Sequence, residues 1–195
     1  SLDVLVHSAG VGSTLRTVAE TPTAEWRHVL EVNLVAAAEV TRLLLPALRA
    51  AQGHVVFINS GAGIRANPGW GAYAASKFGL RGFSESLRSE LEAEDQPVGV
   101  TSVHPGGIRT GIARNARIAA GTDSDEAERG RAAFDKVLRY PADRAAEEII
   151  EAAIARRPRL LIGNDARALD AVARVLPGRY WSLMGRAMSL AAKRS

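Results

Sequence analysis

The sequence contains no cysteine among its 195 residues. Disulfide bonds, thiolate zinc sites and dithiol redox pairs are therefore excluded, while the redox compartment stays open. No apolar run approaches the length of about 20 residues that spans a bilayer. The first ten residues, "SLDVLVHSAG", also lack the basic segment with which a secretory signal begins. We therefore expect a cytoplasmic protein without a membrane span.

Lysine is scarce as well. Of 25 basic residues only Lys77, Lys136 and Lys193 are lysines, and the others are arginines. The net charge is +4, but the arginines are spread among 21 acidic residues, which favours a solvated surface over a nucleic-acid footprint. A hydrophobic content of 47% is typical of a folded globular protein. We expect one domain over 1–195, with a helical tail over 164–195.

Short β-rich runs alternate with long stretches of helical periodicity. This alternation predicts an α/β fold in which crossover helices connect the strands of a parallel sheet. In the first long helix, Thr21 is expected to cap and Pro22 to occupy the first helical position. The polar segment 115–131 is interpreted as a loop or a weak helix. Strands are predicted at 3–8, 54–60, 98–104 and 159–163, and helices at 21–51, 70–94, 142–156, 165–175 and 178–193.

Small residues follow each of the first three predicted strands. Because parallel strands end at the same edge of a sheet, and open α/β sheets bind ligands outside that edge, these loops should meet. Glycines there let a flat or phosphorylated ligand approach the backbone closely. The loop residues are Ser8, Ala9 and Gly10, then Ser60, Gly61, Ala62 and Gly63, then Pro105, Gly106, Gly107 and Thr110.

Tyr73 and Lys77 stand four residues apart near the start of the second long helix, hence on one helix face. A phenol has an ordinary pKa of about 10, and a nearby cation favours its ionised form. A lysine ammonium supplies that charge and three donors, whereas the larger planar head of arginine fits a different geometry. Alone, the pair is more typical of a solvated helix surface. Ser60, at the end of the preceding strand, reverses this interpretation and predicts an acid-base centre.

Several motifs at fixed spacing are found together in one enzyme family. They are Ser60 with Tyr73-x-x-x-Lys77, Asn33 in "VNL", "SAG" at 8–10 and "PGGIRT" at 105–110. With these motifs the whole chain resembles the short-chain dehydrogenase/reductases. The resemblance implies a Rossmann-like parallel sheet. It also implies an enzyme that interconverts an alcohol and a carbonyl by hydride transfer with NAD or NADP, and NADP is favoured.

The resemblance also implies roles for single residues. Tyr73 would be the general acid or base, and Ser60 would hydrogen-bond the substrate oxygen. Lys77 would lower the pKa of Tyr73 and bind the nicotinamide ribose. Asn33 would hold a water of the proton relay, and a helix-kink role for it is equally open. The implied cofactor contacts are Ser8, Ala9, Gly10, Asn33, Tyr73, Lys77, Pro105, Gly106, Ile108 and Thr110. The implied substrate contacts are Ser60, Gly61, Ala62, Ile64, Trp70, Tyr73 and Gly107, together with the segment 111–138.

The chain departs from the family pattern in two places. The family's Asn-Asn-Ala-Gly is here His7-Ser8-Ala9-Gly10, which changes the polar contacts of that loop. No G-x-x-x-G-x-G or G-x-G-x-x-G opens a helix after a strand, so the usual pyrophosphate loop is absent. We interpret the chain as an N-terminally truncated member that lacks the first strand-helix units. The run 3–7 is then expected to form a bare sheet edge.

Other functions stay open to different degrees. The main alternative is a cofactor-free remnant that acts as an oligomerisation or binding module. In either case a homodimer or homotetramer is expected through the helices 21–51 and 70–94, and the amphipathic tail suggests an apolar alcohol or ketone as substrate. A serine hydrolase is disfavoured because Ser60 lacks the G-x-S-x-G turn. The four histidines show no metal-ligand spacing, so no metal site is expected.

Overall fold

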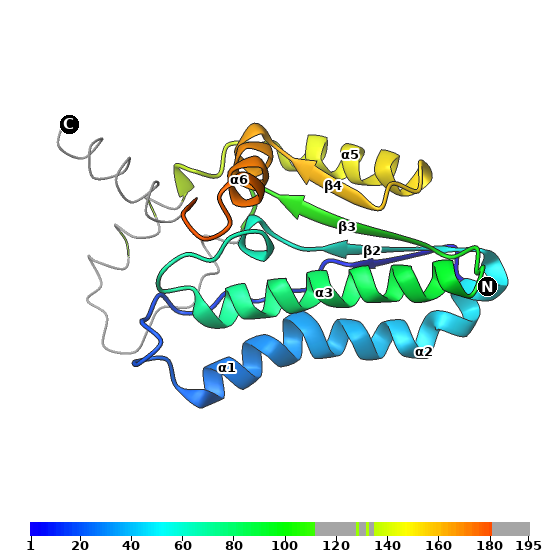
Figure 1. The fold of residues 1–195 in the computed structure, drawn as a ribbon, viewed down its shortest axis with the longest axis horizontal. Helices are drawn as coiled ribbons and strands as arrows, with labels where there is room; N and C mark the ends of the chain where they lie inside the picture. Colours follow the sequence, from blue (N-terminus) through cyan, green and yellow to red (C-terminus); the bar gives the residue numbers. More distant parts are fainter. Residues whose placement is uncertain (112–127, 129–131, 133–134, 181–195) are drawn as a thin grey trace.

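The computed structural model describes residues 1–111, 128, 132 and 135–180. Four parallel strands form one sheet in the order β1-β2-β3-β4. The predicted α/β fold with a parallel sheet is confirmed (Figure 1). The strands are β1 (Val4–His7), β2 (His54–Ile58), β3 (Gly99–Pro105) and β4 (Arg159–Ile162).

Helices cover both faces of the sheet. Figure 1 shows α2 and α3 side by side on one face, with α5 and α6 on the other. The first long helix runs almost continuously through a π-helical turn, η1, and a short 3-10 turn, η2, follows β2. The helical elements are α1 (Thr23–Leu30), η1 (Glu31–Val35), α2 (Ala36–Ala51), η2 (Gly61–Gly63), α3 (Gly71–Ala93), α5 (Ala142–Ile154) and α6 (Asn164–Val175).

Strand β2 explains how the two core layers form. Val55, Val56 and Phe57 are all completely buried, as expected for a strand that helices cover on both faces. Successive side chains of a strand point to opposite faces. Val55 and Phe57 therefore pack with residues of α2 and α3, and Val56 packs in the layer beneath α5. This sandwich fixes the carboxyl ends of β2 and β3, where the predicted site begins.

Strand β1 pairs only with β2 among the described residues, so its outer edge is bare. Val4 and Val6 are 50% and 49% exposed, although both are β-branched residues suited to a buried strand. The expectation of a bare sheet edge over 3–7 is therefore confirmed. Such an edge is a template for pairing with another strand.

Several predicted boundaries need correction. Helix α1 begins at Thr23, with Pro22 in extended conformation before it, and no side chain caps this helix end. The Thr21 hydroxyl instead donates to the carbonyl of Thr17, so its predicted capping role was wrong. The predicted strand 54–60 ends at Ile58, because Asn59 and Ser60 lead into η2.

Two predicted segments cannot be compared with the structure. The polar segment 115–131 lies outside the described residues except at 128, and so does the predicted tail helix 178–193 beyond residue 180. The tail stretch predicted at 165–175 corresponds to α6. In the part of the chain that the structure describes, no helix has the length and apolarity to cross a membrane.

Candidate active site

The three small-residue loops meet at the carboxyl edge of the sheet. A Cβ added to Gly10, in the loop after β1, would lie 3.4 Å from Asn33 Oδ1 and 3.6 Å from Lys77 Nζ. A Cβ added to Gly61, after β2, would lie 3.7 Å from the carbonyl oxygen of Pro105 at the end of β3. The sheet therefore places the loop after β1 beside Lys77, and the loop after β2 beside the loop after β3.

Tyr73 and Lys77 are buried, and they lie beside the half-buried Ser60. Helix α3 presents Tyr73 and Lys77 toward the end of β2, and the two side chains are 7% and 4% exposed. The Tyr73 hydroxyl is hydrogen-bonded to the side chain of Ser60. Lys77 Nζ donates to the carbonyl of Ile58 at 3.0 Å and lies 5.7 Å from the centre of the Tyr73 ring. The combination predicted from the sequence is thus assembled in space.

Burial sets the ionisation of this group. It raises the pKa of Tyr73, and the hydrogen bond with Ser60 opposes this rise only in part. Burial also lowers the pKa of Lys77 to about 8. Lys77 is expected to lower the pKa of Tyr73, but burial is the largest influence on this phenol and shifts its pKa upward. Tyr73 is therefore held as a neutral phenol at pH 7.

Asn33 is held within the π-helical turn η1, as the helix-kink interpretation expects. Its Oδ1 accepts from the Val11 amide at 2.8 Å, and its Nδ2 donates to the Val11 carbonyl and to Ser76 Oγ at 2.9 Å each. The Ser76 hydroxyl in turn donates to the carbonyl of Tyr73 at 2.7 Å. Asn33 thereby ties the loop after β1 to the first turn of α3. Single π-turns are frequent at functional sites.

The turn η2 carries most of the predicted substrate contacts. Ser60 Oγ accepts from the Ala62 amide at 3.1 Å, which leaves the serine hydrogen free for the tyrosine or a ligand. Ala62 and Ile64 are buried beside this turn. Trp70 packs edge-on against the ring of Tyr73, with the ring centres 5.6 Å apart. Trp70, Ala62 and Ile64 thus place an apolar wall beside the Ser60–Tyr73 pair.

The third loop depends on a residue that the sequence reasoning missed. Asp165 of α6 accepts a hydrogen bond from the Gly107 amide at 2.7 Å. A Cβ at Gly107 would overlap the backbone carbonyl of Val137, so this position requires glycine, whereas a Cβ at Gly106 would displace the Asp165 carboxylate. Ile108 pairs with Tyr140 as an isolated bridge, and Thr110 is exposed. An acidic residue just inside the helix after β4 is the only sequence signal for this contact.

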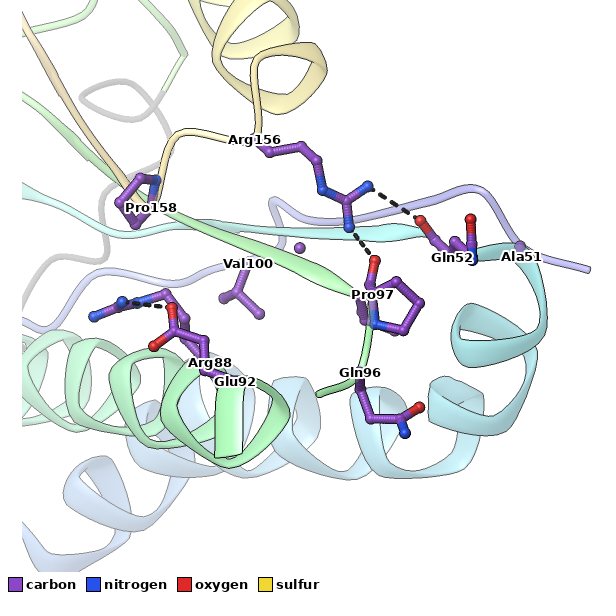
Figure 2. A pocket seen from close by; sticks show the side chains of 11 residues that line it. Ala51, Gln52, Arg88, Glu92, Gln96, Pro97, Val100, Arg156 and Pro158 are labelled. Carbon is purple, nitrogen blue, oxygen red and sulfur yellow. Dashed lines mark hydrogen bonds and ion pairs between the residues drawn. The ribbon is translucent and has the colours of Figure 1, made fainter. Parts of the chain in front are cut away.

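A recess of about 500 Å³ lies at the opposite edge of the sheet, where the strands begin (Figure 2). Arg156 crosses it and donates to the carbonyls of Gln52, at 3.1 Å, and of Pro97. Arg88 and Glu92 form an ion pair on its wall at 2.9 Å. The three charged side chains named here are thus paired with neighbouring groups, and the recess is remote from Ser60 and Tyr73. We interpret it as a structural junction between turns.

Comparison with known proteins identifies the family. The family model described as short chain dehydrogenase matches residues 1–120. The chain belongs to this family, whose Rossmann-like fold is the one observed.

The relatives are longer than this chain. SadH of Mycobacterium tuberculosis, named as an oxidoreductase, is 36% identical over 159 residues, which cover 80% of this chain and 56% of SadH. A short chain dehydrogenase/reductase from Burkholderia phymatum, solved with NAD, superposes with a TM-score of 0.77 at 23% identity, over 88% of this chain and 65% of that one. One from Burkholderia cenocepacia, solved with NADP, gives 0.70 at 23% identity, over 94% and 68%. The chain thus spans about half the length of the curated relative it matches.

Proposed function

We propose that the chain carries the catalytic half of an NAD(P)-dependent oxidoreductase that interconverts an alcohol and a carbonyl compound. The observation that carries the proposal is the hydrogen bond between the half-buried Ser60 and the buried Tyr73, with Lys77 one helical turn away. Two neighbouring hydroxyls can both donate to one substrate oxygen once that oxygen replaces the hydrogen bond between them. Membership of the short chain dehydrogenase family supports the same reaction class.

The residues around Lys77 fit a nicotinamide cofactor on its ribose side. Gly10 is exposed, and its missing side chain leaves room between the loop after β1 and Lys77 Nζ. Lys77 donates one hydrogen bond to Ile58, so two of its three donors stay available for ribose hydroxyls. Pro105, Gly106, Ile108 and Thr110 would hold the carboxamide end of the cofactor, and Ser8 and Ala9 its adenosine side. The bound cofactor would supply or accept the hydride.

The chain's own residues would manage the substrate oxygen. In the reduction direction, Ser60 donates a hydrogen bond that stabilises negative charge on this oxygen, and Tyr73 gives it the phenolic proton. The raised pKa of Tyr73 keeps that proton in place at neutral pH. In the oxidation direction the same phenol must first lose its proton. The protonation state of Tyr73 in the free chain therefore suits carbonyl reduction. The wall formed by Trp70, Ala62 and Ile64 favours an apolar substrate.

Calorimetric titration of the folded chain with NADPH, and separately with NADH, tests the cofactor assignment. Micromolar affinity for either would support it, and tighter binding of NADPH would support the predicted preference for NADP. If a folded chain binds neither, the proposal that this polypeptide holds the cofactor is wrong.

Tyr73→Phe tests the catalytic assignment. The phenyl ring keeps the packing against Trp70, so cofactor affinity and fold should stay nearly unchanged. Turnover should fall by more than a hundredfold, since general acid catalysis contributes about 10² to 10⁴. Tyr140→Phe makes the same chemical change outside the Ser60–Tyr73 pair and should leave turnover intact. Retained activity in Tyr73→Phe would refute the assigned role.

One observation favours an assembly module as the second candidate. Val40, Leu43 and Phe78, on α2 and α3, are large apolar side chains exposed to solvent, and the two helices lie side by side (Figure 1). Such a patch is typical of a protein interface. Sedimentation together with the titration separates the candidates, because an oligomer that binds no nicotinamide would favour the module.

A further inference from the structure

His104 lies at the end of β3, immediately before the third loop, and is completely buried. Its Nδ1 lies 3.3 Å from the carbonyl oxygen of Ser60, and its Nε2 lies 3.2 Å from Ser102 Oγ. A carbonyl oxygen can only accept, so the first contact requires hydrogen on Nδ1. Nε2 then carries a lone pair that accepts from the Ser102 hydroxyl. The two contacts together select the neutral tautomer with hydrogen on Nδ1.

The surroundings keep this ring neutral. Burial and the charge of Arg159 lower the pKa of His104 to about 4, and Arg81 adds to this effect. The hydrogen bond to Ser60 and the charge of Asp170 act in the opposite direction, but they are weaker. The ring therefore brings no charge to the site at pH 7. It contacts the carbonyl of Ser60 and not its hydroxyl, which also argues against a Ser-His nucleophile.

The carbonyl of Ser60 is the anchor of the η2 turn. It accepts from the Gly63 amide at 3.0 Å as well as from the His104 ring. The Ser60 side chain projects from the same residue toward Tyr73, and its Oγ accepts from the Ala62 amide. A rotation of the peptide after Ser60 would change this turn and move the hydroxyl with it.

We propose that His104 is a positioning residue that fixes Ser60 through the Nδ1–H···O=C hydrogen bond and so sets the distance between the Ser60 and Tyr73 hydroxyls. The catalytic meaning of this distance rests on the proposed oxidoreductase function. The contact joins residues 44 apart in the chain and ties the second loop of the site to the third.

Nitrogen-15 spectra of the imidazole rings of the intact chain test the tautomer without any variant. The His104 resonance, assigned with His104→Asn, should show a single neutral ring with hydrogen on Nδ1 from pH 6 to 8. Hydrogen on Nε2, a mixture of tautomers or a charged ring in that range would overturn the proposal. This result does not depend on turnover.

Two variants separate positioning from packing. Asparagine places its amide nitrogen as many bonds from Cβ as histidine Nδ1, whereas glutamine places it at the position of Nε2. His104→Gln should therefore lose the bond to Ser60, and His104→Asn should keep it. Circular dichroism serves as the check that both variants are folded.

The Tyr73 ring carbon that bears the hydroxyl is the reporter. Ser60→Ala should shift its carbon-13 signal, His104→Gln should shift it in the same direction, and His104→Asn should return it toward the wild-type value. A wild-type signal in folded His104→Gln, beside a shifted signal in Ser60→Ala, would overturn the positioning role. So would a shift in His104→Asn as large as that in His104→Gln.

Kinetics provide the functional measurement. With an active chain, His104→Gln should lower kcat about tenfold, since misplacement by about 1 Å can reduce rates up to about a hundredfold. The KM for the cofactor should not change, and His104→Asn should recover most of kcat. An unchanged kcat in folded His104→Gln would overturn the role. An inactive wild-type chain would instead count against the proposed function, and the two spectroscopic results would still decide the positioning role.

Discussion

Lys77→Met should raise the free energy of unfolding at pH 7 and at the same time abolish turnover. The folded chain holds the Lys77 ammonium in a site that is 4% exposed, and this burial lowers its pKa from 10.5 to about 8. Methionine has a similar length and no charge to desolvate. The substitution therefore removes a destabilising effect together with a residue of the proposed active site.

The size of the effect follows from the two pKa values. A difference of about 2.5 between folded and unfolded chain, at about 1.4 kcal/mol for each pKa unit, corresponds to a penalty of about 3 kcal/mol. Methionine also loses the hydrogen bond to the carbonyl of Ile58, which costs about 1 kcal/mol. We therefore expect Lys77→Met to be about 2 kcal/mol more stable than the wild type at pH 7.

The advantage should depend on pH in a defined direction. Below pH 8 both the folded and the unfolded chain keep the Lys77 proton, so the wild type bears the full penalty. Between about pH 8 and 10.5 the folded chain releases this proton first, and the wild type gains stability as the pH rises. The difference between the two proteins should shrink across this window and reverse by about 1 kcal/mol at its upper end, where only the lost hydrogen bond remains.

Urea unfolding followed by circular dichroism at pH 7, 8, 9 and 10 measures this difference. Other groups titrate in both proteins, so their contributions largely cancel when the two curves are subtracted. Lys136→Met is the matched control, because it makes the same chemical change at an exposed lysine. A Lys77→Met variant that is less stable at pH 7, with a difference independent of pH, would refute the reasoning that Lys77 is held charged at the expense of stability.

Two further predictions concern the space around the site. Lys77→Arg should lose about 1–3 kcal/mol of stability and most turnover, because the larger guanidinium must fit between the Ile58 carbonyl and Gly10. Wild-type kinetics in this variant would contradict the prediction. Gly107→Ala should weaken NADPH affinity and lower the melting temperature, since its Cβ would overlap a backbone carbonyl that cannot rotate away. Gly12→Ala is the control, because a Cβ added there meets nothing within 4 Å. Equal NADPH affinity and equal melting temperature in the two alanine variants would show that the loop after β3 is free to move.

The layers of the fold could be predicted because each depends on a local pattern. The run at 54–58 is apolar and β-branched, and it is buried on both faces as β2. The spacing of Tyr73 and Lys77 on one helix turn, after a strand that ends near Ser60, placed three groups together from geometry alone. An open edge over 3–7 was also predicted, and Val4 and Val6 are half exposed along it.

What escaped prediction depends on contacts between distant segments. Asp165 contacts Gly107, which is 58 residues away in the sequence, and His104 contacts Ser60, which is 44 residues away. No periodicity in the sequence predicts either contact. The rise of the Tyr73 pKa on burial was missed for a related reason. Sequence spacing shows that Lys77 is near, but the extent to which packing excludes water from both groups decides which effect is larger.

Hydrogen bonds within the described residues hold the Ser60, Tyr73 and Lys77 region in place, but they hold the loop after β1 less firmly. Three hydrogen bonds fix this region: Asn33 with Val11, Lys77 with Ile58, and His104 with Ser60. Both partners of each bond lie within the described chain. The catalytic geometry should therefore survive in this polypeptide alone. The loop after β1 is different, because it follows an edge strand whose side chains Val4 and Val6 are half exposed. Substrate-side chemistry and cofactor affinity are thus separable, and a strand that pairs with β1 should change the affinity without moving the Ser60–Tyr73 pair.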